Sequence, residues 1–274
     1  MRLGPIAGAT LIVRDLQVSI DAYESLGMVL TERDRVPKQR ALDMGDSALI
    51  DAPRARLACP ADSWADSWLV IIEASQALAS PSFGRRGWLA LALPVADLDL
   101  VRTRLSDSAF VLAPSAEDEF NDHGRAQALI GPNAELLYLL QFESTGPSRL
   151  AAPRCPIDRP CAVALGAQQP ATALAFYEGL GLLDRLHTRW SPSALERGEQ
   201  NGERRALAIG QLAGAHALLI DAVPFLPAAD ATLRLGWRLI SFARSDARLK
   251  RLAGAQDPSA RILAGPEGEG IELL

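Results

Sequence analysis

The chain has 274 residues, of which 49% are hydrophobic and 22% are charged, and its formal net charge at pH 7 is −5. This length is enough for two ordinary domains, and the composition excludes a disordered chain. The negative charge argues against nucleic acid or an anionic membrane as a partner, and no apolar run is long enough to span a bilayer. Because the first residues, Met1–Pro5, have no signal-peptide pattern, a cytoplasmic location is expected.

The first quarter of the chain opens with a strand followed by a helix. Residues 10–16 have the apolar character of a buried strand, and residues 19–28 predict a helix that stops at Gly27, where a left-handed backbone needs no Cβ. Residues 68–74 predict a further buried strand that carries Glu73. Residues 49–53 are an alternative register for that strand. The register with Glu73 is preferred, because Glu73 and Asp221 then correspond and stand at similar distances before the next predicted strand.

The second quarter has the same order of elements. Gly87–Asp97 predicts a strand, and Asp97 is a suitable N-cap for a helix with Leu98, Val101 and Leu105 on one face. A Gly-Pro turn then leads into a last strand over residues 131–141. In the first quarter, residues 40–45 also have strand and turn character.

The third and fourth quarters repeat the first two. Residues 161–165 predict a strand, and residues 171–182 predict an amphipathic helix stopped by Gly181. Tyr177-Glu178 and Gly181 stand in the same relative positions as Tyr23-Glu24 and Gly27. Residues 217–222, 236–246 and 265–274 likewise repeat the later elements of the first half, and residues 205–210 repeat residues 40–45. The chain is therefore predicted to contain four copies of one βαβββ unit.

Two domains follow from this repeat. Residues 1–144 and 157–274 are each predicted to form a domain of two units, and residues 145–156, rich in Pro, Arg and Ala, are predicted to link them.

The opening motif, Val13-Arg14-Asp15-Leu16 with Ser19, Tyr23-Glu24 and Leu26-Gly27, resembles that of the vicinal oxygen chelate superfamily. Residues 175–182 resemble it again. This superfamily includes glyoxalase I, bleomycin- and fosfomycin-resistance proteins and extradiol dioxygenases. The resemblance implies an α+β fold in which four βαβββ modules pair, within each half, into two eight-stranded cup-shaped mixed sheets with flanking helices. It also implies a ligand site inside a cup.

In metal-using members of the superfamily, the ligands come from the first and last strands of each module. The corresponding positions in this chain are Gly8, Glu73, Ala90 and Tyr138 for the first cup, and Ala162, Asp221, Leu239 and Glu272 for the second. Histidine is absent from all of them, so we expect no metal ion and no cofactor. The fallback is one divalent metal ion in the second domain, bound by Asp221 and Glu272, with Glu73 as a further candidate ligand.

The remaining metal-binding side chains do not form a recognisable motif. His123, His187 and His216 have no His or Cys partner at ligand spacing, although His187 or His216 remains an alternative ligand beside Asp221 and Glu272. The three cysteines, Cys59, Cys155 and Cys161, are expected to be reduced thiols.

Aromatic residues suggest what the cups bind instead. Because strand side chains alternate, Trp88 is expected to share the cup face with Ala90, and Trp237 with Leu239. Both indoles would then stack on a ligand; the alternative is that they fill the core. Tyr138 is a candidate hydrogen-bond donor to the ligand or to the backbone. Trp190 and Phe225 are candidates for the rim of the second cup. Arg40 and Arg205 are either partners of the carboxylates or of an acidic ligand, or solvated.

The sequence therefore predicts a metal-independent protein that binds a small apolar or aromatic molecule, and it favours a non-enzymatic role without deciding whether a reaction is catalysed. One alternative is a diverged metal-dependent enzyme of the glyoxalase or extradiol dioxygenase type, such as a lyase, isomerase or dioxygenase, that uses Asp221 and Glu272. A second is a structural or interaction module. The expected partner is the small molecule, and the protein is expected to be a monomer or homodimer.

Overall fold

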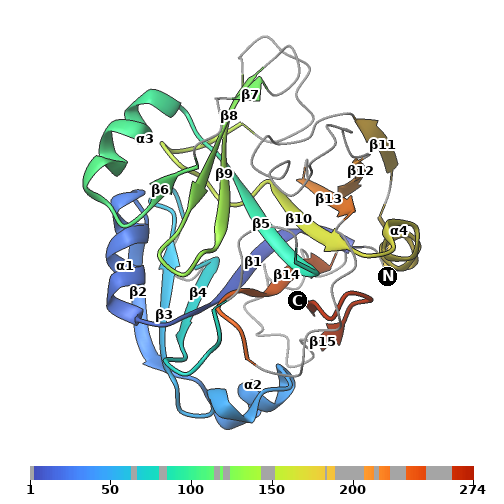
Figure 1. Ribbon diagram of the computed structural model, residues 1–274, viewed down its shortest axis with the longest axis horizontal. Helices are drawn as coiled ribbons and strands as arrows, with labels where there is room; N and C mark the ends of the chain where they lie inside the picture. Colours follow the sequence, from blue (N-terminus) through green and yellow to red (C-terminus); the bar gives the residue numbers. More distant parts are fainter. Residues whose placement is uncertain are drawn as a thin grey trace.

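Two mixed β-sheets form the body of the protein in a computed structural model (Figure 1). The structure describes residues 3–62, 67–79, 85–113, 118–119, 124–142, 152–182, 184–188, 207–212, 216–222, 233–244 and 261–274. Within these residues one sheet has seven strands and the other has nine, and neither sheet is closed. The predicted α+β class is confirmed.

The seven-stranded sheet combines the beginning and the end of the chain. Its strands, in spatial order, are β15 (Arg261–Ala264), β16 (Gly270–Leu273), β14 (Gly236–Arg244), β1 (Leu3–Val13), β4 (Leu69–Glu73), β3 (Pro53–Ala58) and β2 (Val29–Arg35). β1 pairs antiparallel with β14 and parallel with β4.

The nine-stranded sheet contains the middle of the chain. Its strands, in spatial order, are β11 (Asp184–Thr188), β12 (Leu207–Leu212), β13 (His216–Ala222), β10 (Ala162–Ala167), β5 (Gly87–Pro94), β9 (Leu136–Phe142), β8 (Gly124–Ile130) and β6 (Val111–Leu112), and β7 (Asp118–Glu119) also pairs with β8. β5 pairs antiparallel with β10 at the centre of this sheet.

The modules therefore pair across the two halves of the chain, and the predicted pairing within each half is wrong. The first module shares a sheet with the fourth, and the second shares a sheet with the third. Because the first strands of all four modules are similar apolar segments, the sequence identifies the modules but not their partners. The boundaries 1–144 and 157–274 remain a prediction for the division of the sequence into repeats.

The helices confirm most of the local predictions. α1 (Leu16–Ser25) begins after Asp15, whose carboxylate accepts a hydrogen bond from the Val18 N–H, and α3 (Leu98–Arg104) is capped in the same way by Asp97. α4 (Pro170–Gly179) begins with a proline, and a short 3-10 helix, η3 (Leu105–Asp107), extends α3. Figure 1 shows α1 and α3 together on one side of the molecule and α4 on the opposite side.

The glycine stops also have the expected backbone. Gly27 and Gly181, which follow α1 and α4, have φ values of 92° and 99°. The repeat also predicts a fourth helix after residues 236–246, with Leu249 and Leu252 on one face, and this segment lies outside the described residues. None of the helices in the described part of the chain is long and apolar enough to span a bilayer.

The predicted repeat of residues 40–45 in residues 205–210 is wrong in structure. The first segment belongs to a helix, α2 (Lys38–Asp43), which is followed by a 3-10 helix, η1 (Ser47–Leu49), whereas residues 207–212 form β12. Gly45, with a φ of 71°, provides the turn that follows α2.

Within each half, one tyrosine joins the two modules. The Tyr23 hydroxyl of α1 donates to Glu135 Oε1 at 3.4 Å, and the Tyr177 hydroxyl of α4 donates to Glu269 Oε1 at 2.7 Å. Glu135 and Glu269 both lie in the Gly-Pro turns that precede β9 and β16, so the repeated Tyr has a repeated partner. Glycine is required at the start of each turn, because a Cβ on Gly131 would overlap the Glu135 carboxyl group.

One large apolar cluster, the main core, contains side chains from both sheets and from α1, α3 and α4. Each sheet also has a second face, which we call its far face, on the side opposite the main core. A separate apolar cluster lies on the far face of each sheet.

Candidate ligand-binding site

The far face of the seven-stranded sheet is filled by the chain itself. Ile12, Ile72 and Leu239 of this sheet pack against Ala41 of α2 and Leu49 of η1, and all five side chains are buried. A helix therefore occupies the space in which the resemblance places a ligand.

A buried ion pair lies on this face. Glu272 of β16 is 4% exposed, and both of its carboxylate oxygens accept hydrogen bonds from the Arg40 guanidinium of α2, with Nη2 3.0 Å from Oε2. The Ser241 hydroxyl donates to the same Oε2 at 2.5 Å. Of the alternatives left open for Arg40, pairing with a carboxylate is confirmed. A bidentate pair of this kind holds the carboxylate firmly and leaves it poorly available to a metal ion.

Glu73 does not face the predicted cup. It pairs with Val13, a residue of the main core, and its Oε2 accepts a hydrogen bond from the Leu16 N–H at 3.0 Å, at the start of α1. The register of β4 was predicted correctly in outline, because β4 lies parallel to β1 as β13 lies parallel to β10. The predicted correspondence of Glu73 with Asp221 is one position off. Val13 and Ala167 both stand two residues before a helix N-cap, and they pair with Glu73 and Ala222. The residue of β13 that corresponds to Glu73 is therefore Ala222 and not Asp221.

The residues at the predicted metal positions of the seven-stranded sheet do not fit a metal ion. Gly8 and Leu239 offer no ligand atom, Glu73 is directed to α1, and Glu272 is held by Arg40. Asp221 is in β13 of the other sheet, so the fallback pair of Asp221 and Glu272 does not belong to one cup. The Asp221 side chain lies outside the described part of the structure.

A small cavity remains at the edge of this filled face. Its volume is about 180 Å³, and its lining includes Asp43, Met44, Arg238, Leu239 and Ile262. Ligand pockets for drug-sized molecules are typically about 300–1,000 Å³. The cavity is therefore too small for a ligand of that class.

A β-bulge reverses the expected direction of Trp88. The consecutive residues Ala164 and Leu165 of β10 pair with Ala90 and Trp88 of β5, so Leu89 is an extra residue in the ladder. Leu89 and Ala90 both lie in the far-face cluster, whereas the Trp88 side chain lies in the main core and is 2% exposed. The prediction that Trp88 points into a cup is wrong.

The same irregularity occurs at Trp237. Leu11 and Thr10 of β1 are consecutive, but their partners in β14 are Trp237 and Leu239, which leaves Arg238 as the extra residue. Trp237 is 5% exposed in the main core, and its prediction as a cup residue is also wrong.

Both indoles have structural partners in the core. The Trp88 N–H donates to the Gly270 carbonyl at 2.7 Å, and the Trp237 N–H donates to the Leu136 carbonyl at 3.1 Å. Each bond joins one sheet to the other. The alternative that these residues fill the core is the one that the structure supports.

The far face of the nine-stranded sheet is built mainly from small apolar side chains. Seven alanines from four strands belong to its cluster, namely Ala90, Ala92, Ala126, Ala128, Ala162, Ala164 and Ala217. Leu136, Leu140 and Leu219 lie among them, and Tyr138 is on the same face with 2% exposure. Ala90, Ala162 and Tyr138 are the described residues at the positions that the resemblance assigns to metal ligands, so this face also does not fit a metal ion.

His216, the histidine whose side chain the structure describes, does not lie on the far face of its sheet. His216 begins β13, and burial lowers its pKa to about 4, so the imidazole is neutral at pH 7. Its neighbour Ala217 is on the far face, and alternation directs His216 to the other side. The side chains of His187, His123, Trp190, Phe225 and Arg205 lie outside the described part of the structure.

Sequence reasoning missed α2, and it gave the pairing of Arg40 with a carboxylate only as one of several alternatives. The only local signal was Gly45, which stands where a helix C-terminal stop is favoured. The pairing of Arg40 with Glu272 joins residues from the first and fourth modules and has no local signature.

No protein-family model matches the sequence, and no curated protein matches it. Among solved structures, the chain is similar to a proposed dioxygenase from Bacillus subtilis, with 13% identity, a TM-score of 0.64, and 99% of this chain and 85% of that chain covered. It is also similar to glyoxalase I from Zea mays, with 13% identity, a TM-score of 0.61, and 98% and 91% of the two chains covered. At these identities the likeness shows the fold.

Proposed function

Because the chain has the fold of the vicinal oxygen chelate superfamily, we propose that it binds a small, mainly apolar molecule without a metal ion. The proposed site is the far face of the nine-stranded sheet. The observation that carries this proposal is the alanine-rich floor, because short side chains on neighbouring strands form a smooth apolar surface on which a ligand can pack. These alanines are at most 8% exposed, so a ligand would replace the part of the chain that covers the floor in this structure.

The choice between the two sheets rests on what fills them. On the seven-stranded sheet, α2 and the Arg40–Glu272 pair occupy the far face and leave a cavity of about 180 Å³. The nine-stranded sheet has no corresponding helix among the described residues. One observation favours the structural-module alternative, namely the filled far face of the seven-stranded sheet. We therefore propose a structural role for that sheet alone.

Metal independence is supported by the chemistry of the side chains. Ala90 and Ala162 carry no donor atom, and a tyrosine hydroxyl is a weak substitute for imidazole or carboxylate. The proposed ligand therefore gains its affinity from burial of apolar surface. Burial contributes about 25 cal/mol per Å², so about 200 Å² of buried ligand surface supplies about 5 kcal/mol before the costs of association.

The test uses a fluorescent apolar anion, 8-anilinonaphthalene-1-sulfonate, titrated into the folded protein. We expect saturable one-to-one binding that Ala164→Phe weakens by at least about tenfold, because a phenyl group fills the floor. Ala74→Phe is the matched control, since Ala74 is a partly buried alanine beside the far-face cluster of the other sheet. Ala217→Leu, at a position that is 8% exposed, serves as a second floor variant if Ala164→Phe does not fold.

Two results would count against the proposal. One is equal affinity of the wild type and both floor variants at an unchanged urea midpoint. The other is a requirement for a divalent ion, seen as loss of probe binding in a chelator and recovery on adding zinc or manganese. The cytoplasmic location and the monomeric or homodimeric state remain predictions from the sequence.

A further inference from the structure

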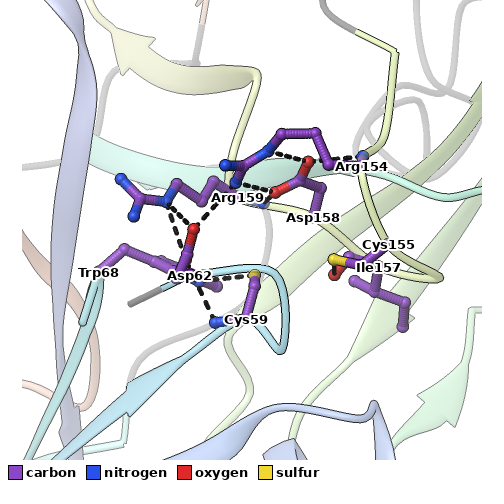
Figure 2. Close-up of polar contacts among 8 residues, drawn as sticks. All are labelled: Cys59, Asp62, Trp68, Arg154, Cys155, Ile157, Asp158 and Arg159. Carbon is purple, nitrogen blue, oxygen red and sulfur yellow. Dashed lines mark hydrogen bonds and ion pairs between the residues drawn. The ribbon is translucent and has the colours of Figure 1, made fainter. Parts of the chain in front are cut away.

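Two cysteines distant in the sequence meet beside the segment that joins the two halves. Cys59 directly follows β3, and Cys155 lies in the segment 152–161 that precedes β10. Their sulfur atoms lie within 4.8 Å of each other (Figure 2). The third cysteine, Cys161, is buried, and its thiol is directed to the Ala92 carbonyl.

The two thiols differ in access. Cys59 is 1% exposed, and its sulfur accepts a hydrogen bond from the Trp68 indole N–H at 3.1 Å. Cys155 is half-buried, and its thiol donates to the Ile157 carbonyl at 3.0 Å. A reagent from solvent therefore reaches Cys155 first.

Ion pairs that do not involve sulfur hold the two cysteine segments together. Asp62, three residues after Cys59, accepts from Arg159 Nε at 2.8 Å and from Arg154 Nη2 at 2.9 Å. Asp62 also accepts from the Cys59 N–H at 3.3 Å. In Figure 2 these contacts lie beside the two sulfur atoms. The ion pairs therefore bring the two cysteine segments together without a bond between the sulfurs.

Asp158 lies near both thiols but is not free to complete a metal site. Its Oδ1 accepts from Arg154 Nη2 and the Arg159 N–H, and its Oδ2 accepts from the N–H and Nε of Arg154, at distances of 2.6 to 2.8 Å. These four bonds use the in-plane acceptor positions of the carboxylate. Two thiolates alone do not complete the four-coordinate site that structural zinc prefers.

We propose that Cys59 and Cys155 form an intramolecular disulfide when the protein meets a low-molecular-weight disulfide such as oxidised glutathione. A disulfide requires a sulfur–sulfur distance of about 2.05 Å, so the proposal requires that rotation of the cysteine side chains close the remaining separation. The bond would join the end of β3 to the segment between the two halves.

The exchange proceeds in two balanced steps. The Cys155 thiolate attacks one sulfur of oxidised glutathione, which forms a mixed disulfide and releases one glutathione thiol. The Cys59 thiolate then attacks the Cys155 sulfur and releases the second glutathione thiol. The two cysteines lose two electrons and two protons, and the two glutathione thiols produced gain these electrons and protons.

The surroundings make this exchange slow at neutral pH. Burial raises the pKa of both thiols above the ordinary value, so little thiolate is present. The rate is expected to rise with pH up to at least pH 9, because the thiolate is the attacking species.

The test uses the full chain, reduced and freed of reductant, then incubated with oxidised glutathione at pH 8.5. We expect the number of free thiols to fall from three to one, and peptide mapping to find a Cys59–Cys155 bridge. Melting temperature should rise on oxidation, because the bridge restricts the unfolded chain. Cys161→Ser should fall from two free thiols to none, and Cys155→Ser should form no intramolecular bridge.

The proposal is overturned if all three thiols of the folded wild type persist at equilibrium, or if the bridge that forms includes Cys161. It is also overturned if zinc binds stoichiometrically and the Cys155→Ser variant loses that zinc, since the pair would then be a metal site. Cys155 is half-buried, so its serine variant is expected to fold; circular dichroism before oxidation checks this.

Discussion

The Glu135 carboxyl group offers a direct test of the contact that joins α1 to the first Gly-Pro turn. Glu135 is 1% exposed, and it accepts hydrogen bonds from the Asn133 N–H at 2.8 Å and from the Tyr23 hydroxyl at 3.4 Å. Burial in the low-dielectric interior raises the pKa of this carboxyl group to about 7. Between pH 4.5 and about 7 the folded protein therefore retains a proton that the unfolded chain has already lost.

The sign of the effect on stability follows from this difference. The pKa of Glu135 is higher in the folded state than its ordinary value of 4.5. Its contribution to stability is therefore fully present below pH 4.5 and is lost as the pH rises through about 7. One pKa unit corresponds to about 1.4 kcal/mol, so the loss amounts to about 3 kcal/mol in total.

Glu135→Gln removes this dependence, because the neutral amide resembles the protonated acid. We expect the variant to match the wild type at pH 4.5 and to be more stable at pH 8.5 by about 2–3 kcal/mol. Urea unfolding at both pH values measures the difference, in which the other titrating groups cancel. Glu24→Gln is the matched control, since Glu24 is an exposed glutamate beside Tyr23 on α1.

The reasoning is refuted if the free-energy difference between Glu135→Gln and the wild type is the same at both pH values. It is also refuted if Glu24→Gln shows the same pH-dependent gain, because the effect would then come from net charge and not from burial.

Two further predictions concern buried polar contacts. Arg40→Met leaves the Glu272 carboxylate buried without its cation, so it should lower the free energy of unfolding, measured with urea, by about 3–5 kcal/mol. Adding Glu272→Leu should recover most of this loss. A loss below about 1 kcal/mol for the single variant contradicts the prediction. Tyr177→Phe removes a 2.7 Å hydrogen bond to Glu269 and should cost about 1–3 kcal/mol, more than Tyr23→Phe, whose bond is 3.4 Å; the reverse order of the two costs would be inconsistent with the geometry.

Local features of the fold could be predicted because their signals lie within a few residues of one another. Asp15 and Asp97 cap α1 and α3, and Gly27 and Gly181 have positive φ values where the sequence places helix stops. Hydrophobic period and cap residues depend on backbone geometry over one or two turns, so neighbouring residues specify them.

The tryptophan predictions failed for a definite reason. One extra residue in β5 and one in β14 shift the alternation of side chains, which moves Trp88 and Trp237 from the predicted cup faces into the main core. A one-residue change of register moves a side chain to the other face of a sheet. The sequence of an apolar strand carries no clear mark of such a bulge.

The sequence by itself determined the α+β class and the absence of histidine from the positions that the resemblance assigns to metal ligands, and it predicted the repeated unit. Only the tertiary structure decided which modules share a sheet, since β1 pairs with β14 and β5 pairs with β10 across the two halves. It also decided that α2 fills one far face and that Cys59 lies beside Cys155. These contacts join residues far apart in the chain, and their free energy depends on the packing of whole elements, to which no short stretch of sequence corresponds.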